Sequence, residues 1–438
     1  MIKTNKNTKA DNWQYLDYLK NKVNSDYNAL LTIINNLIPG ISYEVMKGIL
    51  GIDYLIKADG VIGTNCDYIN IPSTLEQNKT YWITEGTYLQ GASDITILSN
   101  AKLIGVGNKY NIIIDWQTNT NGFVTSITPN VLANTSTGTT RNSQTITNIG
   151  GTWASWTGTV DDTAFFMLIM TDNSTNHYGV KYKLIQIDSN NQLQVDEYLD
   201  LATGIKAGYG ILLNMNYGIE LRNFTIQNSN DSLSTINISY TTDSIFSDLV
   251  FYKCKGNGAF WADAYCVDCR FENILINDCE GVTFGAIGVG LVFNCIFKNG
   301  VIKNCRSTSG SSQGIFVLER PFKSVVDNWE VSGNYSAGNG GGIGSLAPFL
   351  SHITNNRVVY NEAAINGGGI YINGYYGAAR AHIFGNDCYQ NYAAGLGSSI
   401  YVPANNFTMI HDNRIYTTRG GTNVSIAAGN DAQDNYTS

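Results

Sequence analysis

The sequence is poor in proline and in charged residues. Among 438 residues there are only 6 prolines, charged residues make up 14% of the chain, and the net charge is −8. No run of lysine and arginine offers the cationic surface that phosphate backbones and anionic lipids attract, so we expect no nucleic-acid partner. No stretch approaches the ~20 apolar residues of a membrane span, and the polar N-terminus MIKTNKNTKADNWQYL lacks the apolar core of a signal peptide. We therefore expect no membrane insertion and no secretory signal.

Cysteine is scarce as well. Eight cysteines in a chain of this length do not form a disulfide scaffold. The motif Cys266-Val-Asp-Cys269 has no second cysteine pair at the spacing that zinc sites use. The sequence therefore predicts neither a metal nor a cofactor.

What the chain does contain is glycine and apolar residues. There are 45 glycines, and 43% of the residues are apolar. This composition favours many short strands joined by turns that require positive φ, and it disfavours long helices over most of the chain. A chain of this size can bury a large core as one elongated body.

One segment differs from the rest. Between residues 11 and 38 apolar residues recur every three or four positions, and Pro39-Gly40 ends the pattern. The apolar positions are Trp13, Leu16, Leu19, Val23, Tyr27, Leu30, Ile34 and Leu37. The pattern predicts an amphipathic helix. We expect this helix either to mediate assembly, as a coiled coil or by docking on another protein, or to cap the end of the solenoid of its own chain.

The rest of the chain divides by its pattern of short runs. Residues 80–116 show apolar runs of four to six residues separated by glycine, asparagine and serine, which are typical of first solenoid strands. The stretch 120–215 is rich in threonine and asparagine, and its alternating runs indicate a β-rich insertion. We therefore divide the chain into an N-terminal helical anchoring or assembly segment (1–55), first coils (56–119), the insertion (120–215) and a main solenoid (216–438).

An internal repeat runs from about residue 215 to the end. In each unit a short apolar run meets an asparagine or aspartate and a second short run follows, at intervals of 25 to 30 residues. The shared polar positions are Asn223, Asp248, Asn273, Asn299, Asn328, Asn356, Asn386 and Asn413. Because asparagine and aspartate tolerate the left-handed conformation of a tight bend, and stacked amides bond to one another, each unit is interpreted as one coil.

A second series lies between these polar positions. Segments such as GAFWAD, GAIGVG and GIYING carry an apolar residue at equivalent places. These places are Phe260, Ile287, Ile315, Ile343, Ile370 and Ile400. Each coil thus has three short strands and no helix, which predicts an all-β, right-handed, three-sheet parallel β-helix with a short N-terminal helical segment.

These repeats resemble the pectin-lyase-like superfamily over roughly residues 80–438. ITEGTYLQGASDITILSNAKLIGVGN is similar to the first coils of phage tailspikes, whereas GGGIGS and GGGIYI beside FENI and IFGN resemble repeats of bacterial surface adhesins. The fold hosts lyases, hydrolases, esterases and plain binders, so the resemblance specifies the fold better than the function. The missing leader and the N-terminal helix favour a virion protein of the phage tail, made in the bacterial cytoplasm. The resemblance also implies a homotrimer. The helix predicted at residues 11–38 is expected to attach the chain to other tail or baseplate proteins.

Aromatic residues are candidates for binding sugar. Alternation in the GAFWAD-type strands predicts that Trp261, Phe316, Tyr371 and Tyr401 face outward. Because coils stack about 4.8 Å apart, the first three are expected roughly 10 Å apart, a spacing that suits sugar rings. The resemblance implies the same face for saccharide. The alternatives are that a neighbouring chain covers these aromatics in a trimer, or that they merely cover the sheet.

Candidate catalytic residues lie on the same strand series. Asp263 is expected to face outward two coils from Glu319, and such a pair suits inverting hydrolysis, which needs carboxyls roughly 6.5–9.5 Å apart. A lyase needs a base beside a cation, for which Arg320 is the nearest candidate. The alternative is that all three are solvated turn residues.

Other columns of the repeat have structural explanations. Cys254, Cys279 and Cys305 are expected to stack, as are Cys269 and Cys295, with their thiols reduced. His352 and His382 share a column in which neither cysteine nor carboxylate accompanies them, so we assign them no metal.

The sequence therefore supports two functions of different classes. The first is a phage receptor-binding spike that binds bacterial surface polysaccharide, with cleavage by a hydrolase or a lyase left open. The second is a non-enzymatic adhesin or structural fibre that contacts only protein.

Overall fold

The computed structural model describes most of the chain from residue 43 onward. The described residues are 43–63, 65–91, 93–117, 119, 122–125, 132–139, 145–147, 153–161, 164–172, 176–189, 192–195, 208–230, 234–262, 265–373, 380–403, 408–415, 424–426, 431–433 and 436–437. The helix predicted at 11–38 and the candidate Asp263 lie outside them. At the start, helix α3 (Tyr43–Leu50) precedes the first strand, and its Lys47 binds the carboxylate of Asp67 at 2.9 Å. Among the described helices none is long and apolar enough to cross a membrane.

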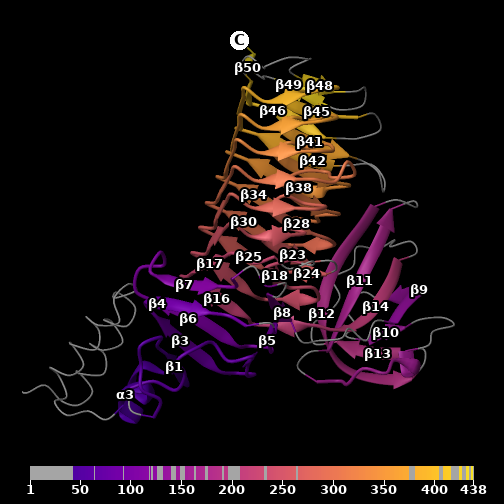
Figure 1. Ribbon diagram of the computed structural model, residues 1–438. Helices are drawn as coiled ribbons and strands as arrows, with labels where there is room; N and C mark the ends of the chain where they lie inside the picture. Colours follow the sequence, from indigo (N-terminus) through magenta and orange to yellow (C-terminus); the bar gives the residue numbers. More distant parts are fainter. Residues whose placement is uncertain are drawn as a thin grey trace, which may run out of the picture.

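The chain winds into a parallel β-solenoid, which confirms the predicted right-handed three-sheet β-helix (Figure 1). Sheet I contains β2 (Thr74–Leu75), β5 (Ile95–Ile97), β8 (Phe123–Thr125), β18 (Ile236–Asn237), β23 (Phe260–Ala262), β28 (Ile287–Val289), β33 (Phe316–Glu319), β37 (Ile343–Leu346), β41 (Ile370–Asn373), β45 (Ile400–Val402) and β48 (Val424–Ile426). Each strand pairs in parallel with the strand one coil away, so residues about one repeat apart in sequence become lateral neighbours.

Two further long sheets complete each coil. Sheet II contains β1 (Tyr54–Ile56), β3 (Thr80–Thr84), β6 (Lys102–Val106), β16 (Glu220–Arg222), β20 (Ile245–Ser247), β25 (Arg270–Glu272), β30 (Ile296–Lys298), β34 (Val325–Asp327), β38 (Phe349–Thr354), β42 (Arg380–Phe384), β46 (Met409–His411) and β49 (Asp431–Gln433). Sheet III contains β4 (Gly86–Leu89), β7 (Ile112–Asp115), β17 (Thr225–Gln227), β21 (Val250–Tyr252), β26 (Leu275–Asn277), β31 (Val301–Lys303), β35 (Glu330–Ser332), β39 (Arg357–Val359), β43 (Asp387–Tyr389), β47 (Arg414–Ile415) and β50 (Tyr436–Thr437).

Two short sheets lie at the corners of the coil. The first, before sheet II, contains β15 (Asn216–Tyr217), β19 (Thr241–Thr242), β24 (Cys266–Val267) and β29 (Val292–Phe293). The second, after sheet III, contains β22 (Lys255–Gly256), β27 (Glu280–Gly281), β32 (Arg306–Ser307), β36 (Tyr335–Ser336), β40 (Glu362–Ala363) and β44 (Tyr392–Ala393). In the coils that contain these short strands the chain therefore turns in small steps.

The core is a set of stacked apolar columns. On sheet II the inward positions include Phe246, Phe271 and Phe297, which are fully buried. The ring centroids of Phe271 and Phe297 lie 4.4 Å apart with an interplanar angle of 6°. Such aromatic pairs contribute about 0.5–1.5 kcal/mol beyond the burial of their area.

The bend between sheets II and III contains the asparagines of the repeat, but in two adjacent columns. Asn273 and Asn299 have φ near 57° and 56° and occupy the exposed left-handed place, and the N–H of Asn273 donates to Lys298 O of the next coil at 3.0 Å. In later coils Asn355 takes that place, while Asn356 points inward and is 1% exposed. The expectation of one shared position is therefore wrong for Asn356, Asn386 and Asn413. The position with left-handed φ and the position that points inward are consecutive in sequence, and asparagine occupies both. The spacing of asparagines in the sequence therefore does not distinguish the two positions.

The inward asparagines form a hydrogen-bonded ladder. The amide oxygen of Asn386 accepts the backbone N–H of Asn356 at 2.9 Å, and its NH₂ group donates to Asn413 Oδ1 at 2.8 Å. At the corner after sheet III, Asn361 accepts the N–H of Asn334 in the same way at 3.1 Å. Each coil thus satisfies a corner N–H of its neighbour, which matters because an unpaired buried N–H costs about 1–3 kcal/mol.

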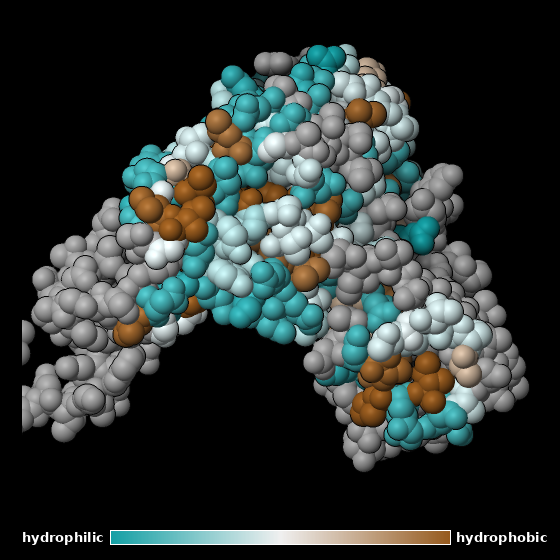
Figure 2. Space-filling model, turned by 60° about the horizontal axis from the view of Figure 1, so that its bottom comes forward, coloured by the Kyte–Doolittle hydropathy of each residue, from teal (hydrophilic) through white to brown (hydrophobic). Residues whose placement is uncertain are grey.

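A closed barrel projects from the side of the solenoid (Figure 1). Its strands are β9 (Leu132–Thr139), β10 (Thr145–Thr147), β11 (Ala164–Asp172), β12 (Asn176–Ser189), β13 (Gln192–Val195) and β14 (Gly208–Asn214), with a short 3₁₀ turn at Trp153–Ser155. The chain leaves the solenoid after β8 and returns at β15, after which β16 pairs directly with β6. Phe165 and Leu213 of the barrel pack against Phe293 of the corner sheet. In Figure 2 the barrel is a separate lobe beside the N-terminal coils, with a hollow between them.

Candidate functional site

The outward face of sheet I holds most of the residues that the sequence singled out. Strand register places Trp261, Gly288, Val317, Gly344, Tyr371 and Tyr401 at the same outward position of successive coils. This set, with the residues that lie over it, is called the sheet I face below.

Phe316 does not belong to the sheet I face. It pairs with Ile287 and Ile343, is 0% exposed, and its ring packs edge to face against Trp329 at 5.0 Å. The expectation that it faces outward is therefore wrong. Ile315 and Phe316 are both apolar and both fully buried, so alternation in the sequence did not reveal that the register here is displaced by one residue.

Trp261 belongs to an aromatic cluster that the sequence only half revealed. Its ring lies 4.8 Å from the ring of Phe284, which comes from the loop after β27. Phe284 lies across Gly288, where an added Cβ would approach the ring to 2.3 Å. The outward glycine thus makes room for an aromatic side chain from a loop. That glycine was the one sequence signal for Phe284.

Tyr371 and Tyr401 form a second cluster further along the solenoid. Their rings are parallel within 4° at a centroid distance of 5.7 Å, and Asn373 donates its amide N–H to the Tyr371 hydroxyl at 3.0 Å. Burial, with Tyr401 beside it, raises the pKa of Tyr371 to about 12. Tyr371 is only 6% exposed and Tyr401 is half-buried, so Tyr401 offers most of the accessible aromatic surface.

The middle of the sheet I face is covered by the chain itself. Val317 is 0% exposed. At Gly344 an added Cβ would lie 2.0 Å from Gln313 O, so the loop before β33 runs directly over this glycine. The aromatics therefore form two separate clusters and not one continuous ladder.

The candidate acid Glu319 ends strand β33, on the coil midway between the clusters. It is half-buried and follows the inward Leu318, which places it on the outward side. Arg320 comes next with φ 47°, and its N–H donates to Leu346 O at 2.7 Å. Since Asp263 lies outside the described residues, the separation of the expected carboxylate pair stays a prediction.

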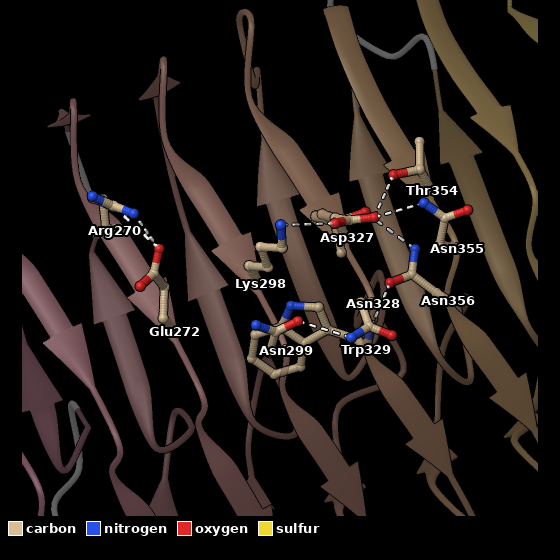
Figure 3. Close-up of polar contacts among 11 residues, drawn as sticks. Arg270, Glu272, Lys298, Asn299, Asp327, Asn328, Trp329, Thr354, Asn355 and Asn356 are labelled. Atoms are coloured by element: carbon tan, nitrogen blue, oxygen red, sulfur yellow. Dashed lines mark hydrogen bonds and ion pairs between the residues drawn. The ribbon is translucent and has the colours of Figure 1, made fainter.

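A polar surface, separate from the sheet I face, lies on the outer side of sheet II beside the asparagine bend (Figure 3). The carboxylate of Asp327 accepts the Asn355 amide at 2.8 Å and the Thr354 hydroxyl at 3.0 Å, and Lys298 lies 3.7 Å away. On β25, Arg270 binds Glu272 at 2.7 Å. These contacts join neighbouring coils or neighbouring residues within one strand. We therefore assign a structural role to this surface, because the carboxylates of Asp327 and Glu272 are paired within the solenoid and do not form an acid pair open to substrate.

Aromatic and histidine side chains continue this outer side toward the C-terminal coils. The rings of His352 and His382 lie 5.0 Å apart edge to face, and Phe384 stacks on His411 at 5.3 Å. Burial, with His382 adding to it, lowers the pKa of His352. In the described part of the chain, the one group of three or more potential metal ligands lies elsewhere, at Cys266, Cys269 and Cys295.

Comparisons with known proteins were made by sequence and by structure. No protein-family model matches the chain, and no curated protein matches it. By structure it is similar to the tailspike gp49 of Pseudomonas phage LKA1, with TM-score 0.39 and 12% identity over 80% of this chain and 74% of that one. It is also similar to the tailspike gp61 of Pseudomonas phage phi297, with TM-score 0.33 and 9% identity over 80% of this chain and 66% of that one. A third similar structure is the gp54 tailspike of Acinetobacter baumannii bacteriophage AP22 in complex with a capsular saccharide, with TM-score 0.30 and 11% identity over 96% and 75%.

Proposed function

We propose that this chain is a receptor-binding spike of a phage tail and that it binds bacterial surface polysaccharide along the sheet I face. The observation that carries the proposal is the presence of two aromatic clusters on one face, Trp261 with Phe284 and Tyr371 with Tyr401. Four coil steps separate Trp261 from Tyr371, which is about 19 Å at ~4.8 Å a coil. A polysaccharide several sugar rings long spans that distance and can pack apolar ring faces on both clusters.

The sign and size of the charge agree with such a ligand. The net charge is −8, and charged residues are few, so a long-range attraction does not explain binding and contact chemistry must. Aromatic faces and half-buried polar groups supply that chemistry for a neutral or weakly charged glycan. The same features do not suit nucleic acid.

Cleavage is a separate step of the proposal. Glu319 and Arg320 lie on the coil midway between the clusters, where a bound polysaccharide would pass. Hydrolysis needs a second carboxyl, for which Asp263 remains the proposed partner, and elimination needs a base beside a cation. The proposal therefore assigns any depolymerase activity to this coil.

Assembly is also part of the proposal. We assign the segment 1–55, with its expected helix at 11–38, to attachment to other tail proteins, and we expect a homotrimer in the virion. Light scattering on the intact protein measures the oligomeric state directly. A monomer at all concentrations would contradict the trimer without touching the polysaccharide assignment.

The binding test uses purified capsular and exopolysaccharides on the intact protein. Trp261→Ala and Tyr401→Ala each remove one aromatic contact, and we expect each to weaken binding about 5- to 30-fold, since such a contact contributes about 1–2 kcal/mol. The matched control is Tyr360→Ala, because Tyr360 is 47% exposed and pairs with another tyrosine, Tyr389, away from sheet I. Wild-type affinity in both sheet I variants would refute the proposed face.

Cleavage is tested on the polysaccharide that binds. Release of reducing ends indicates hydrolysis, and release of unsaturated ends indicates elimination. We expect Glu319→Gln to abolish whichever is seen while binding persists. Binding without release of either kind makes the chain a binder only, and binding to protein alone would favour the fibre or adhesin function instead.

A further inference from the structure

Three cysteines meet inside the wall of the solenoid, at the corner before sheet II. Cys266 lies on β24, Cys269 lies between β24 and β25, and Cys295 lies one coil away. All three are 0% exposed, and their Sγ atoms lie within 4.8 Å of one another. The Sγ atoms of Cys266 and Cys295 are 3.8 Å apart. Sulfur ligands on one zinc ion, each at about 2.3 Å, lie roughly 3.8 Å from each other.

The solenoid does not need cysteine at this corner. In the same column Ser324 accepts the N–H of Cys295 at 3.2 Å, Ser351 accepts that of Ser324 at 3.3 Å, and Ser244 accepts that of Ile219 at 3.0 Å. Serine therefore satisfies the corner N–H wherever it stands in this column. Cys269 and Cys295 perform this task through sulfur, a weaker acceptor, with the N–H of Cys269 3.4 Å from Cys295 Sγ.

The other cysteine column lacks this convergence. Cys254, Cys279 and Cys305 also stack in register and are almost fully buried, but in the described chain they do not form a group of three sulfurs within reach of one ion. Stacking alone therefore brings cysteines near each other without making a ligand set. The set at the first corner arises because Cys266, from an adjacent short strand, turns toward the column.

The thiols at this corner also bond to backbone carbonyls. Cys295 Sγ donates to Cys266 O at 3.3 Å, and Cys269 Sγ donates to Val267 O at 3.3 Å. Cys305 Sγ of the other column donates to Lys303 O at the same distance, so these bonds do not distinguish the two columns, and the convergence of the three sulfurs does.

We propose that Cys266, Cys269 and Cys295 form a structural site for one soft divalent cation, zinc being the physiological candidate. At least two of the three thiols lose their protons to solvent on binding, which balances the two positive charges of the ion inside the wall. Thiolates select soft cations over magnesium and calcium. Because all three residues are buried, the ion enters as these coils close. This inference revises the expectation from the sequence that the chain holds no metal, and it does not depend on the proposed glycan binding.

The experiment measures metal in the intact protein. The chain is produced in medium supplemented with Zn²⁺ or Cd²⁺, passed over a chelating resin, and examined by native mass spectrometry and elemental analysis. We expect about one ion per chain, with sulfur-to-cadmium charge-transfer absorption in the Cd²⁺ sample. In Cys269→Ser and Cys295→Ser the cysteine is replaced by serine, the residue that stands in the same column at Ser244 and Ser324. We expect each variant to lower the metal content about tenfold or more.

Controls separate a metal site from a packing role. Cys279→Ser removes a cysteine from the other column and should keep the full metal content. Cys266→Val, which introduces the residue found at 292 one coil away, is the second test if either serine variant fails to fold, as judged by circular dichroism. Metal-free wild-type protein with all its thiols titratable after denaturation would overturn the proposal, as would equal metal loss in Cys279→Ser or a disulfide between Cys266 and Cys295.

Discussion

The inward asparagine ladder allows a sharp test, since one chemical change made in two neighbouring columns should have opposite outcomes. In Asn386→Asp the side chain keeps its shape but loses its NH₂ group, which donates to Ile353 O at 2.9 Å and to Asn413 Oδ1 at 2.8 Å. Asn386 is 0% exposed, so the introduced carboxyl must stay protonated or be ionised against carbonyl oxygens. In Asn299→Asp the side chain is exposed, and aspartate already occupies that column at Asp248 and Asp412.

The cost follows from two contributions. A protonated carboxyl keeps one of the two donors, so about 1–3 kcal/mol is lost for the acceptor left unpaired. Keeping it protonated at pH 7 costs about 4 kcal/mol more, because the carboxyl ionises near pH 3.9 in the unfolded chain and each pH unit above that adds about 1.4 kcal/mol. The destabilisation of Asn386→Asp should therefore be about 5–7 kcal/mol at pH 7 and fall to about 1–3 kcal/mol near pH 4. We expect Asn299→Asp to change stability by less than about 0.5 kcal/mol at either pH.

The assay is denaturant unfolding followed by tryptophan fluorescence and by far-UV circular dichroism, at pH 7 and at pH 4. Stacked coils need not unfold in one step, so the shift in the first transition that includes the C-terminal coils is compared between the two variants and the wild type. Equal shifts for Asn386→Asp and Asn299→Asp, or a penalty for Asn386→Asp that does not change with pH, would refute the assignment of the two columns.

Three further predictions test the site and its surroundings. Phe316→Ala should lower the free energy of unfolding by about 3–5 kcal/mol and leave polysaccharide affinity unchanged, because the ring is buried. Loss of affinity in a stably folded variant would show that Phe316 contacts the polysaccharide after all. Gly288→Ala should displace the Phe284 ring and weaken polysaccharide binding about as much as Trp261→Ala, as measured by calorimetry, and unchanged binding would show that Phe284 takes no part. His382→Gln should raise the pKa of His352 toward its ordinary value in an NMR titration. In the wild type, whose His352 pKa is lowered, stability should fall as pH drops below about 6.5, and a rise would contradict this sign.

Much of the architecture could be predicted because the solenoid repeats its chemistry. Asparagines and isoleucines recurring at intervals of 25 to 30 residues indicated three strands a coil, and the pairing of Glu272 with Lys298 and of Leu275 with Val301 confirms the stack. Trp261 and Tyr401 were found by alternation, since the strands around them are regular. Phe316 was misplaced, and Asn356 was aligned one column away from its true place. A displacement of one residue exchanges the two sides of a strand and leaves the spacing almost unchanged.

The sequence by itself determined the stacking of the coils. Each bend has a residue that tolerates the left-handed conformation, and apolar residues alternate along each strand. Parallel stacked coils are the arrangement that both buries these apolar residues and pairs the backbone groups. Only the tertiary structure decided which loop residues lie over the sheet I face, so that Phe284 joins Trp261 while Gln313 covers Gly344. It also decided that Cys266 turns toward Cys295 from a different strand. These contacts join segments whose spacing in sequence follows no repeat, and they depend on how loops pack after the coils have formed.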